Sequence, residues 1–300
     1  MATTYAIPRP KEFKLFIHKL RDYYELTKPE VNLLILMATS AGYFLGSPGK
    51  LKVAGLVNTV LGTLLVASGT ATLNQLMERT HDAQMRRTAN RPLPSGRVTA
   101  RQALLSGLVL SLSGGLYLFI AVNALTALLA ITTLLSYLLI YTPLKRKTAL
   151  CTLLGAIPGA MPTLIGWAGA SNAVGPRAWL LFAILFLWQF PHFLAIALMY
   201  REDYARAGYQ MLPDFDADGR FTRAEIVLFA VVLFVVTMVP ALGHHSSLVY
   251  PLAMAVAGVF FLYYIARLAI YHSSVSASRV VHASVIYLPL VLSVMIFFRP

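Results

Sequence analysis

Three side chains with oxygen atoms recur at four-residue spacing, directly after a long apolar run. They are Asn74, Glu78 and Asp82. On a helix, residues four apart share one face, so the spacing predicts a row of oxygens along one side. Amide and carboxylate oxygens are suitable ligands for Mg²⁺, and the arginines that follow suit a multiply charged phosphate. We therefore expect this block to bind a metal-neutralised diphosphate.

This row of oxygens is too long for a single ion. A rise of about 1.5 Å per residue separates Asn74 from Asp82 by roughly 12 Å, whereas a magnesium–oxygen distance is about 2.1 Å. A diphosphate that bridges one or two Mg²⁺ ions can reach both ends. The alternative is a solvated helix end with incidental acids, which the apolar run before Asn74 disfavours.

Several arginines lie within or just after the row, and they are candidates for direct contacts with the diphosphate. Cations are needed there because several negative charges must be neutralised. Anchoring at a membrane face would also explain the arginines, but it would not explain why they alternate with acids. The candidates are Arg79, Arg86, Arg87 and Arg91.

Two further polar segments carry residues of the same kinds. Segment 141–147 offers Tyr141, Lys145 and Arg146, which suit phosphate binding or plain membrane anchoring. Segment 200–213 offers Asp203 and Arg206. Asp203 would supply a second carboxylate wall opposite the row, or belong to an ordinary helix end with exposed salt bridges. The residues alone leave these alternatives open.

His192 lies inside an apolar run, next to Pro191. A histidine at membrane depth is a functional candidate, although a histidine packed against helix carbonyls is the commoner case.

The elements that position these residues are membrane-spanning helices. Of the 300 residues 58% are hydrophobic and 12% charged, against about 25% charged in soluble domains. The apolar runs are too long and continuous for barrel strands. We predict an all-α membrane protein with about nine transmembrane helices bundled around a central cavity, at 31–46, 53–77, 103–121, 124–141, 150–170, 179–199, 226–242, 248–271 and 281–298.

The charge distribution predicts the orientation. The net charge is +13, and with the N-terminus inside, most Lys and Arg residues fall on the cytoplasmic side, as the positive-inside rule requires. Membrane topology therefore explains the excess positive charge, and a nucleic-acid partner is not needed to explain it. The C-terminus is expected outside. The basic segment 1–28 shows no signal peptide and no long Arg- and Ser-rich leader, which favours a bacterial cytoplasmic membrane.

We expect one polytopic domain over 1–300, with a cytoplasmic N-terminal segment at 1–28. The chain has two long polar loops: the first polar loop at 78–101 and the second polar loop at 200–223. An even number of spans separates them, so both lie on one side of the membrane, as does the third polar loop at 141–147. The single cysteine, Cys151, excludes an intrachain disulfide and is expected to pack as a small apolar residue.

Together these motifs resemble those of the UbiA superfamily of intramembrane prenyltransferases. The similarity covers roughly residues 26–298, and within the superfamily the chain is most similar to members that farnesylate haem B. The matching motifs lie at 74–94, 141–146, 188–193 and 201–208.

The resemblance implies farnesyl diphosphate with Mg²⁺ as donor, haem B as acceptor, and a hand-off of the product to haem A synthase or a terminal oxidase. It implies that Asn74, Glu78, Asp82 and Asp203 bind the magnesium diphosphate, with Tyr141 and Lys145 as diphosphate contacts. Asp82, Lys145 and Asp203 are the expected catalytic residues. His192 is then a candidate contact for haem iron or substrate.

The resemblance breaks at Ala207, where the superfamily usually has a second carboxylate. Only Glu202 lies near enough in sequence to replace it. Two alternatives stay open: a sister enzyme with another aromatic acceptor, such as a quinone precursor, and a secondary transporter of an anionic substrate. Transporters place ionisable groups near the bilayer midplane, whereas the charges of this chain gather at one face.

Overall fold

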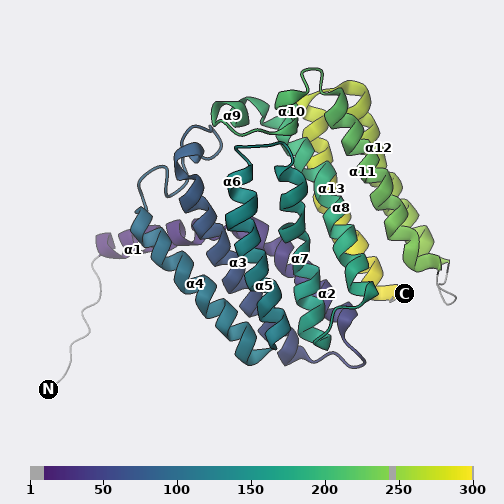
Figure 1. Ribbon diagram of the computed structural model, residues 1–300, viewed down its shortest axis with the longest axis horizontal. Helices are drawn as coiled ribbons and strands as arrows, with labels where there is room; N and C mark the ends of the chain where they lie inside the picture. The colour runs from purple at the N-terminus through teal and green to yellow at the C-terminus, as the bar shows by residue number, and fades with distance from the viewer. Residues whose placement is uncertain (1–9, 243–247, 299–300) are drawn as a thin grey trace.

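The computed structural model describes residues 10–242 and 248–298, and every regular element within them is a helix (Figure 1). The predicted all-α class is therefore confirmed. The helices up to the third polar loop are α1 (Pro10–Leu26), α2 (Pro29–Gly46), α3 (Val53–Asp82), α4 (Ala100–Ala121), α5 (Ala124–Ser136), the π-helical turn η1 (Tyr137–Tyr141) and α6 (Thr142–Leu144). The helices that follow are α7 (Cys151–Ser171), α8 (Pro176–Met199), α9 (Arg201–Arg206), α10 (Leu212–Phe215), α11 (Arg220–Met238), the 3-10 turn η2 (Val239–Leu242), α12 (Val249–Tyr271) and α13 (Ser274–Phe298).

Eight helices in the described part of the chain are long and apolar enough to cross a membrane, and all eight overlap expected spans. The remaining expected span, at 31–46, forms helix α2, which has 18 residues but is not among the eight. The count of nine therefore stays a prediction.

The helices extend into the expected polar segments at three places. Helix α3 continues to Asp82, so Glu78 and Asp82 belong to the helix and not to the first polar loop. The N-terminal segment contains a helix, α1, where only a polar stretch was expected. The second polar loop contains α9 and α10, and α11 begins at Arg220, within the expected loop. Polar residues extend these helices beyond the apolar runs from which their ends were predicted.

Two hydrophobic cores fill the bundle, and they share α7 and α8, which lie centrally in Figure 1. One core joins these two helices to α2, α11, α12 and α13. The other joins them to α3, α4 and α5. Helices α7 and α8 therefore connect the half that carries the oxygen row to the half formed by α11, α12 and α13.

Helices α2 and α7 approach each other closely at glycines. A Cβ atom on Gly166 would collide with the carbonyl oxygen of Thr39, and one on Gly42 would collide with that of Thr163. Small residues allow membrane helices to pack backbone against backbone. This contact fixes α2 beside the central helices.

The end of the bundle that carries the polar loops, called the loop side below, has small apolar clusters of its own. Leu26, Leu93, Val98 and Ala103 pack together and join the end of α1 to the first polar loop. On the same loop, the Arg97 side chain contacts Asp22 of α1 at 2.7 Å, and this acid raises the pKa of the guanidinium. The first polar loop is thus held by packing as well as by surface charge.

Candidate active site

The oxygen row forms as predicted on one face of α3. Asn74, Glu78 and Asp82 are all buried, with exposed fractions of 0%, 7% and 1%. Burying carboxylates is costly unless cations or hydrogen-bond donors compensate them. The neighbours of this row therefore decide what the site can bind.

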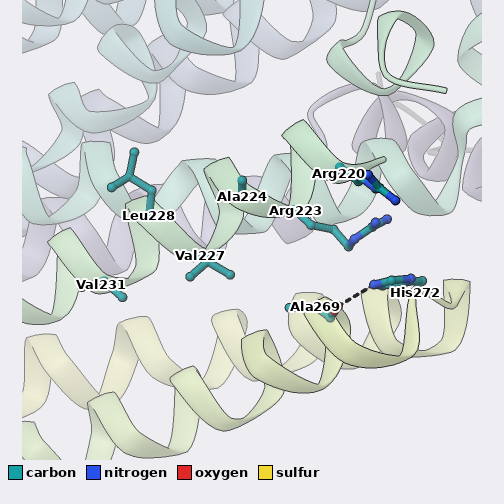
Figure 2. Close-up of a pocket in the computed structure, with 8 residues that line it drawn as sticks. All are labelled: Arg220, Arg223, Ala224, Val227, Leu228, Val231, Ala269 and His272. Atoms are coloured by element: carbon teal, nitrogen blue, oxygen red, sulfur yellow. Dashed lines mark hydrogen bonds between the residues drawn. The ribbon is translucent and has the colours of Figure 1, made fainter. Parts of the chain in front are cut away.

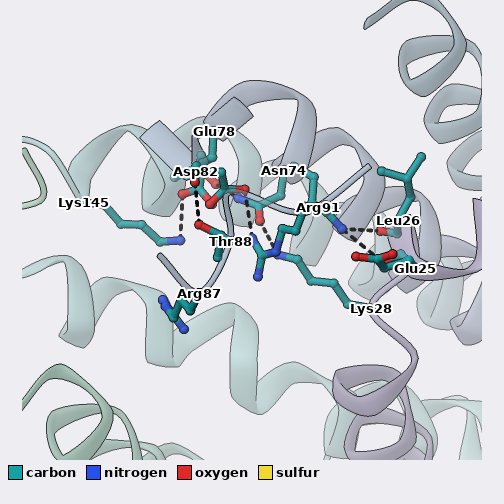
Figure 3. Close-up of polar contacts among 12 residues, drawn as sticks. Glu25, Leu26, Lys28, Asn74, Glu78, Asp82, Arg87, Thr88, Arg91 and Lys145 are labelled. Carbon is teal, nitrogen blue, oxygen red and sulfur yellow. Dashed lines mark hydrogen bonds and ion pairs between the residues drawn. The ribbon is translucent and has the colours of Figure 1, made fainter. Parts of the chain in front are cut away.

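Each member of the row contacts a different cation (Figure 3). Lys28 Nζ donates to Asn74 Oδ1 at 2.6 Å, and Lys145 Nζ donates to Glu78 Oε1 at 2.8 Å. Arg91 forms an ion pair of 2.9 Å with Asp82. The three cations come from the α1–α2 connection, the third polar loop and the first polar loop. Three segments distant in sequence thus converge on one row.

A local irregularity in the helix places the third polar loop. Pro143 has no amide hydrogen, so a regular helical ladder cannot continue through it. The chain forms the π-helical turn η1 directly before it, a feature often found at functional sites. Thr142 Oγ1 donates to the Tyr137 carbonyl at 2.9 Å and accepts from Asn74 Nδ2 at 3.1 Å. This pair of bonds ties the turn to the oxygen row.

Lys145 is held beside the row by neighbours of its own. Its ammonium group lies 4.6 Å from the centre of the Tyr141 ring. Burial acts to lower the pKa of Lys145, but the attraction of Glu78 and the two nearby tyrosines outweighs burial and raises that pKa well above its usual value. Lys145 therefore remains a cation, which favours the binding of phosphate.

The three polar loops meet, as their placement on one side of the membrane predicted. Asp203 is 8% exposed, and its Oδ2 accepts from the Arg87 backbone N–H at 3.5 Å. Gln210 N–H donates to the Lys145 carbonyl at 2.8 Å. Asp203 also pairs with Arg206 at 3.3 Å. The second polar loop therefore contacts both of the others, and no described contact joins Asp203 directly to Asp82.

Arg87 has a different environment from Arg91. Its guanidinium donates to the Tyr204 hydroxyl at 2.7 Å and lies 4.9 Å from the centre of the Tyr200 ring. Arg87 thus joins the first polar loop to the second, whereas Arg91 contacts the oxygen row.

Three predicted substrate arginines lie apart from the row. Arg79, Arg86 and Arg146 are exposed, and no described contact brings them to it. The Arg79 guanidinium instead donates to the Leu76 carbonyl of its own helix at 3.0 Å. One residue along a helix turns the side chain by about 100°, so Arg79 cannot share a face with Glu78.

Position 207, where a second carboxylate was missing, lies in an apolar cluster. Ala207 is 3% exposed and packs with Met85, Cys151 and Tyr209. Glu202, the expected substitute, is exposed. In the described structure, Asp203 is therefore the one buried carboxylate of the second polar loop.

Lys28 was not predicted as a site residue, because in the sequence it is only one of several basic residues in segment 1–28. It lies in the left-handed region, with φ of 52°, directly before Pro29 of α2. Burial lowers the pKa of Lys28 to about 7, and repulsion from Arg91 contributes further. The sequence shows only a lysine directly before Pro29 at the start of a span, and its partner Asn74 is visible only in the fold.

A cavity of about 270 Å³ opens beside the oxygen row and extends between the central helices. Its lining is mainly apolar, and Lys28 and Tyr141 connect it to the row. Gln189 and His192 are polar residues of its inner wall. The cavity thus joins an apolar space to a cluster of cations.

His192 is 8% exposed, and its ring stacks on Trp188 at 4.8 Å between ring centres. Its Nδ1 lies 2.7 Å from Ser284 Oγ. That hydroxyl donates to the Val281 carbonyl, also at 2.7 Å, so it accepts the proton of His192 Nδ1. Nε2 of the neutral ring then keeps a lone pair, as a ligand for a metal centre requires.

The oxygen row also fits a hard cation. Within the described residues, no group of three or more His, Cys, Asp or Glu side chains could hold a metal ion by itself. Mg²⁺ does not need such a cage, because it usually binds one or two carboxylates together with phosphate oxygens and water. The donors here are carboxylate and amide oxygens, so they suit Mg²⁺ that arrives with a diphosphate.

Comparison with known proteins adds to this geometry. The model of the UbiA prenyltransferase family matches residues 35–286. A curated relative from Solibacter usitatus (strain Ellin6076), named protoheme IX farnesyltransferase, is 49% identical over 94% of this chain and 99% of its own length.

Two solved structures have a similar fold. A digeranylgeranylglyceryl phosphate synthase gives a TM-score of 0.76 at 18% identity, over 94% of this chain and 98% of that chain. A UbiA homologue from Archaeoglobus fulgidus bound to GPP and Mg²⁺ gives 0.63 at 16% identity, over 91% and 99%.

Proposed function

Because the chain belongs to the UbiA prenyltransferase family, we propose that it transfers a farnesyl group from farnesyl diphosphate to a vinyl group of haem B, giving haem O and diphosphate. The name of the Solibacter relative supports this choice of donor and acceptor. The observation that carries the proposal is the set of three cations around the buried oxygen row, at the mouth of an apolar cavity.

The reaction begins when the bond between farnesyl C1 and its diphosphate oxygen breaks, with the electron pair leaving on the diphosphate. Lys28, Lys145 and Arg91 stabilise that developing charge, the kind of term that usually dominates such catalysis. The apolar cavity holds the farnesyl chain, at about 0.8 kcal/mol per buried CH₂, and keeps bulk water from the allylic cation.

The vinyl π electrons of haem B then form the new carbon–carbon bond. The second cation, now next to the porphyrin ring, takes up one water molecule and releases one proton, which completes a hydroxyethylfarnesyl group. Asn74, Glu78, Asp82 and Asp203 would hold Mg²⁺, which supplies further positive charge to the diphosphate. The Archaeoglobus homologue, which binds GPP and Mg²⁺, supports this choice of metal.

His192 is the residue through which haem B would be oriented. His192 lines the cavity, and because its Nδ1 is engaged with Ser284, Nε2 is the ring nitrogen that remains for a ligand. We assign it a contact with the haem iron, which would hold the porphyrin while a vinyl group reaches the farnesyl cation.

The protein would act as a single domain in a bacterial inner membrane, with the polar loops and the N-terminus in the cytoplasm. Farnesyl diphosphate is charged at one end and apolar at the other, so a site at the loop side of a membrane bundle suits it. The product, haem O, would pass to haem A synthase or to a terminal oxidase.

Product analysis tests the proposal. The purified chain, given farnesyl diphosphate, haem B and Mg²⁺, should yield haem O on chromatography and mass spectrometry, and a metal chelator should abolish the reaction. Asp82→Ala should lower kcat by roughly 10²–10³, the usual loss when one electrostatic contact to a developing charge is removed. Full magnesium-dependent transfer by Asp82→Ala would overturn the assignment.

Two further assays separate the alternatives. Prenylation of 4-hydroxybenzoate in place of haem B would indicate a quinone-pathway enzyme. Uptake of an unaltered anionic substrate into proteoliposomes, without any prenylated product, would indicate a transporter.

A further inference from the structure

A second concave site lies between α11 and α12, at the loop side of the bundle (Figure 2). This α11–α12 groove measures about 640 Å³. It has a basic end, formed by Arg220, Arg223 and His272, and an apolar wall along α11. It shares no lining residue with the central cavity, so the proposed prenyl transfer does not use it.

The basic end has charge that the described protein does not neutralise. Neither Arg220 nor Arg223 forms an ion pair within residues 10–242 and 248–298. The nearby Asp216 accepts from the Thr222 backbone N–H at 2.7 Å and so caps the start of α11. Two guanidinium groups are thus left for an anion, and arginine matches phosphate oxygens in a two-point geometry.

His272 adds a third polar group at the same end, as Figure 2 shows. It follows the last residue of α12 and has a left-handed backbone, with φ of 51°. Its Nε2 donates to the Ala269 carbonyl at 2.6 Å, because a carbonyl can only accept. That bond fixes the ring, and Nδ1 has no partner among the described contacts. Nδ1 can donate to a phosphate in the imidazolium form, which carries a proton on both ring nitrogens.

The wall of the groove follows one face of α11. Ala224, Val227, Leu228 and Val231 recur at helical spacing, and Leu228 is 58% exposed. Val231 lies about 16 Å along the helix axis from Arg220, close to the depth of one leaflet, since the hydrocarbon core is about 30 Å thick. The groove therefore runs from the membrane surface toward the midplane.

We propose that the α11–α12 groove binds one anionic phospholipid of the leaflet on the loop side. Its phosphate lies between Arg220, Arg223 and His272, and one acyl chain lies along Val227 and Val231. Basic pockets between membrane helices bind anionic lipid headgroups in this way. A free phosphate would leave the apolar wall uncovered, which is why the occupant is a lipid.

Lipid binding to the purified full-length protein tests the assignment. Native mass spectrometry would count dioleoylphosphatidylglycerol or dioleoylphosphatidylcholine retained by the protein in detergent. We expect the anionic lipid to bind about tenfold more tightly, from two arginines at the membrane surface. Equal retention of both lipids would overturn the proposal. Displacement of the anionic lipid by soluble glycerol 3-phosphate at equal concentration would also overturn it, since that result describes a phosphate site.

Variants locate the binding. The double change Arg220→Gln and Arg223→Gln should lower retention of the anionic lipid about tenfold. The control pair, Lys19→Gln and Arg101→Gln, removes the same charge from exposed residues outside the groove and should leave retention within about twofold. Equal loss in both pairs would show non-specific charge attraction and overturn the assignment.

A third change tests the acyl chain. Ala224→Phe keeps both arginines and fills the groove, so it should also lower retention of the anionic lipid. Unchanged retention in Ala224→Phe would contradict the path along α11. Thermal unfolding of each variant shows whether the fold is intact, and the comparison of the two lipids on the unaltered protein needs no variant.

Discussion

The contact of Lys28 with Asn74 adds a cation from the N-terminal side to the oxygen row, where we propose that diphosphate binds. Lys28→Met removes one of the three cations around the oxygen row and keeps most of the side-chain volume. We expect the KM for farnesyl diphosphate to rise about 10- to 100-fold, since a hydrogen bond to a charged group contributes about 1.5–3 kcal/mol. Steady-state kinetics with haem B held in excess measure this change.

Lys19→Met is the matched control, because Lys19 is exposed on α1 and has no described contact with the row. Its KM should equal that of the unaltered protein. A Lys28 variant with the same KM as this control would show that Lys28 is structural and does not bind diphosphate.

His192 and Ser284 form the second residue-scale unit. His192→Ala removes the Nε2 lone pair. We expect haem B to bind about tenfold more weakly, because the loss of a residue that orients a metal ligand typically lowers affinity by about 10- to 100-fold. Ser284→Ala removes only the acceptor that fixes the ring tautomer, so its effect on affinity should be smaller. Titration of haem B, followed by the Soret band, measures both.

The Soret band also separates ligation from packing. Loss of an iron ligand shifts the band of bound haem, whereas loss of a packing contact weakens binding without a shift. An unshifted band in His192→Ala would remove His192 from the iron and leave it as a wall residue stacked on Trp188.

At the scale of elements, the close contact of α2 with α7 leaves no room for a larger side chain at its glycines. Gly166→Ala places a methyl group against the Thr39 carbonyl of α2. Backbone cannot move aside as a flexible side chain does, so we expect a loss of about 1–3 kcal/mol in unfolding free energy. A lower midpoint of thermal unfolding in detergent would show it.

Gly175→Ala is the matched control, because it makes the same substitution at a glycine that does not lie against another helix. Gly175 has φ of −103° and no neighbour within 4 Å of an added Cβ. Its unfolding midpoint should match that of the unaltered protein. If both alanine variants unfold at one temperature, α2 and α7 are less closely packed than described.

Helical spacing predicted the elements well where one helix holds all the relevant residues. The four-residue repeat of Asn74, Glu78 and Asp82 gave the buried face of α3, because the pattern and the geometry are both local. Helix ends were less predictable. Hydrophobicity marked the apolar part of α3, but its last turn is buried by ion pairs with Lys145 and Arg91, which no local pattern contains.

At the scale of the whole molecule, the sequence predicted that the three polar loops lie at one end of the bundle, but it did not predict which of their residues are neighbours. Counting spans placed the three polar loops together, and their contacts confirm it. The contact of Lys28 with Asn74 joins residues 46 positions apart. Nor could composition distinguish Arg91, which reaches Asp82, from the exposed Arg86. Which arginine reaches the oxygen row depends on how the first polar loop folds.

The orientation of the bundle is the prediction that concerns the molecule as a whole, and the single cysteine makes it testable. Cys151 is 1% exposed and packs in an apolar cluster, as expected, so Cys151→Ala gives a cysteine-free background at small cost. In that background, Lys50→Cys marks the α2–α3 connection and Arg101→Cys marks the start of α4. Both positions are exposed, and α3 separates them across the membrane.

A membrane-impermeant maleimide added to intact spheroplasts should label Lys50→Cys and spare Arg101→Cys until the membrane is opened. The physical reason is the excess of Lys and Arg on the loop side, which should keep that side in the cytoplasm. Protection of both positions before opening, with labelling of both afterwards, would place them on one side and contradict α3 as a span. The reverse pattern would place the oxygen row outside the cytoplasm and would contradict the proposed orientation.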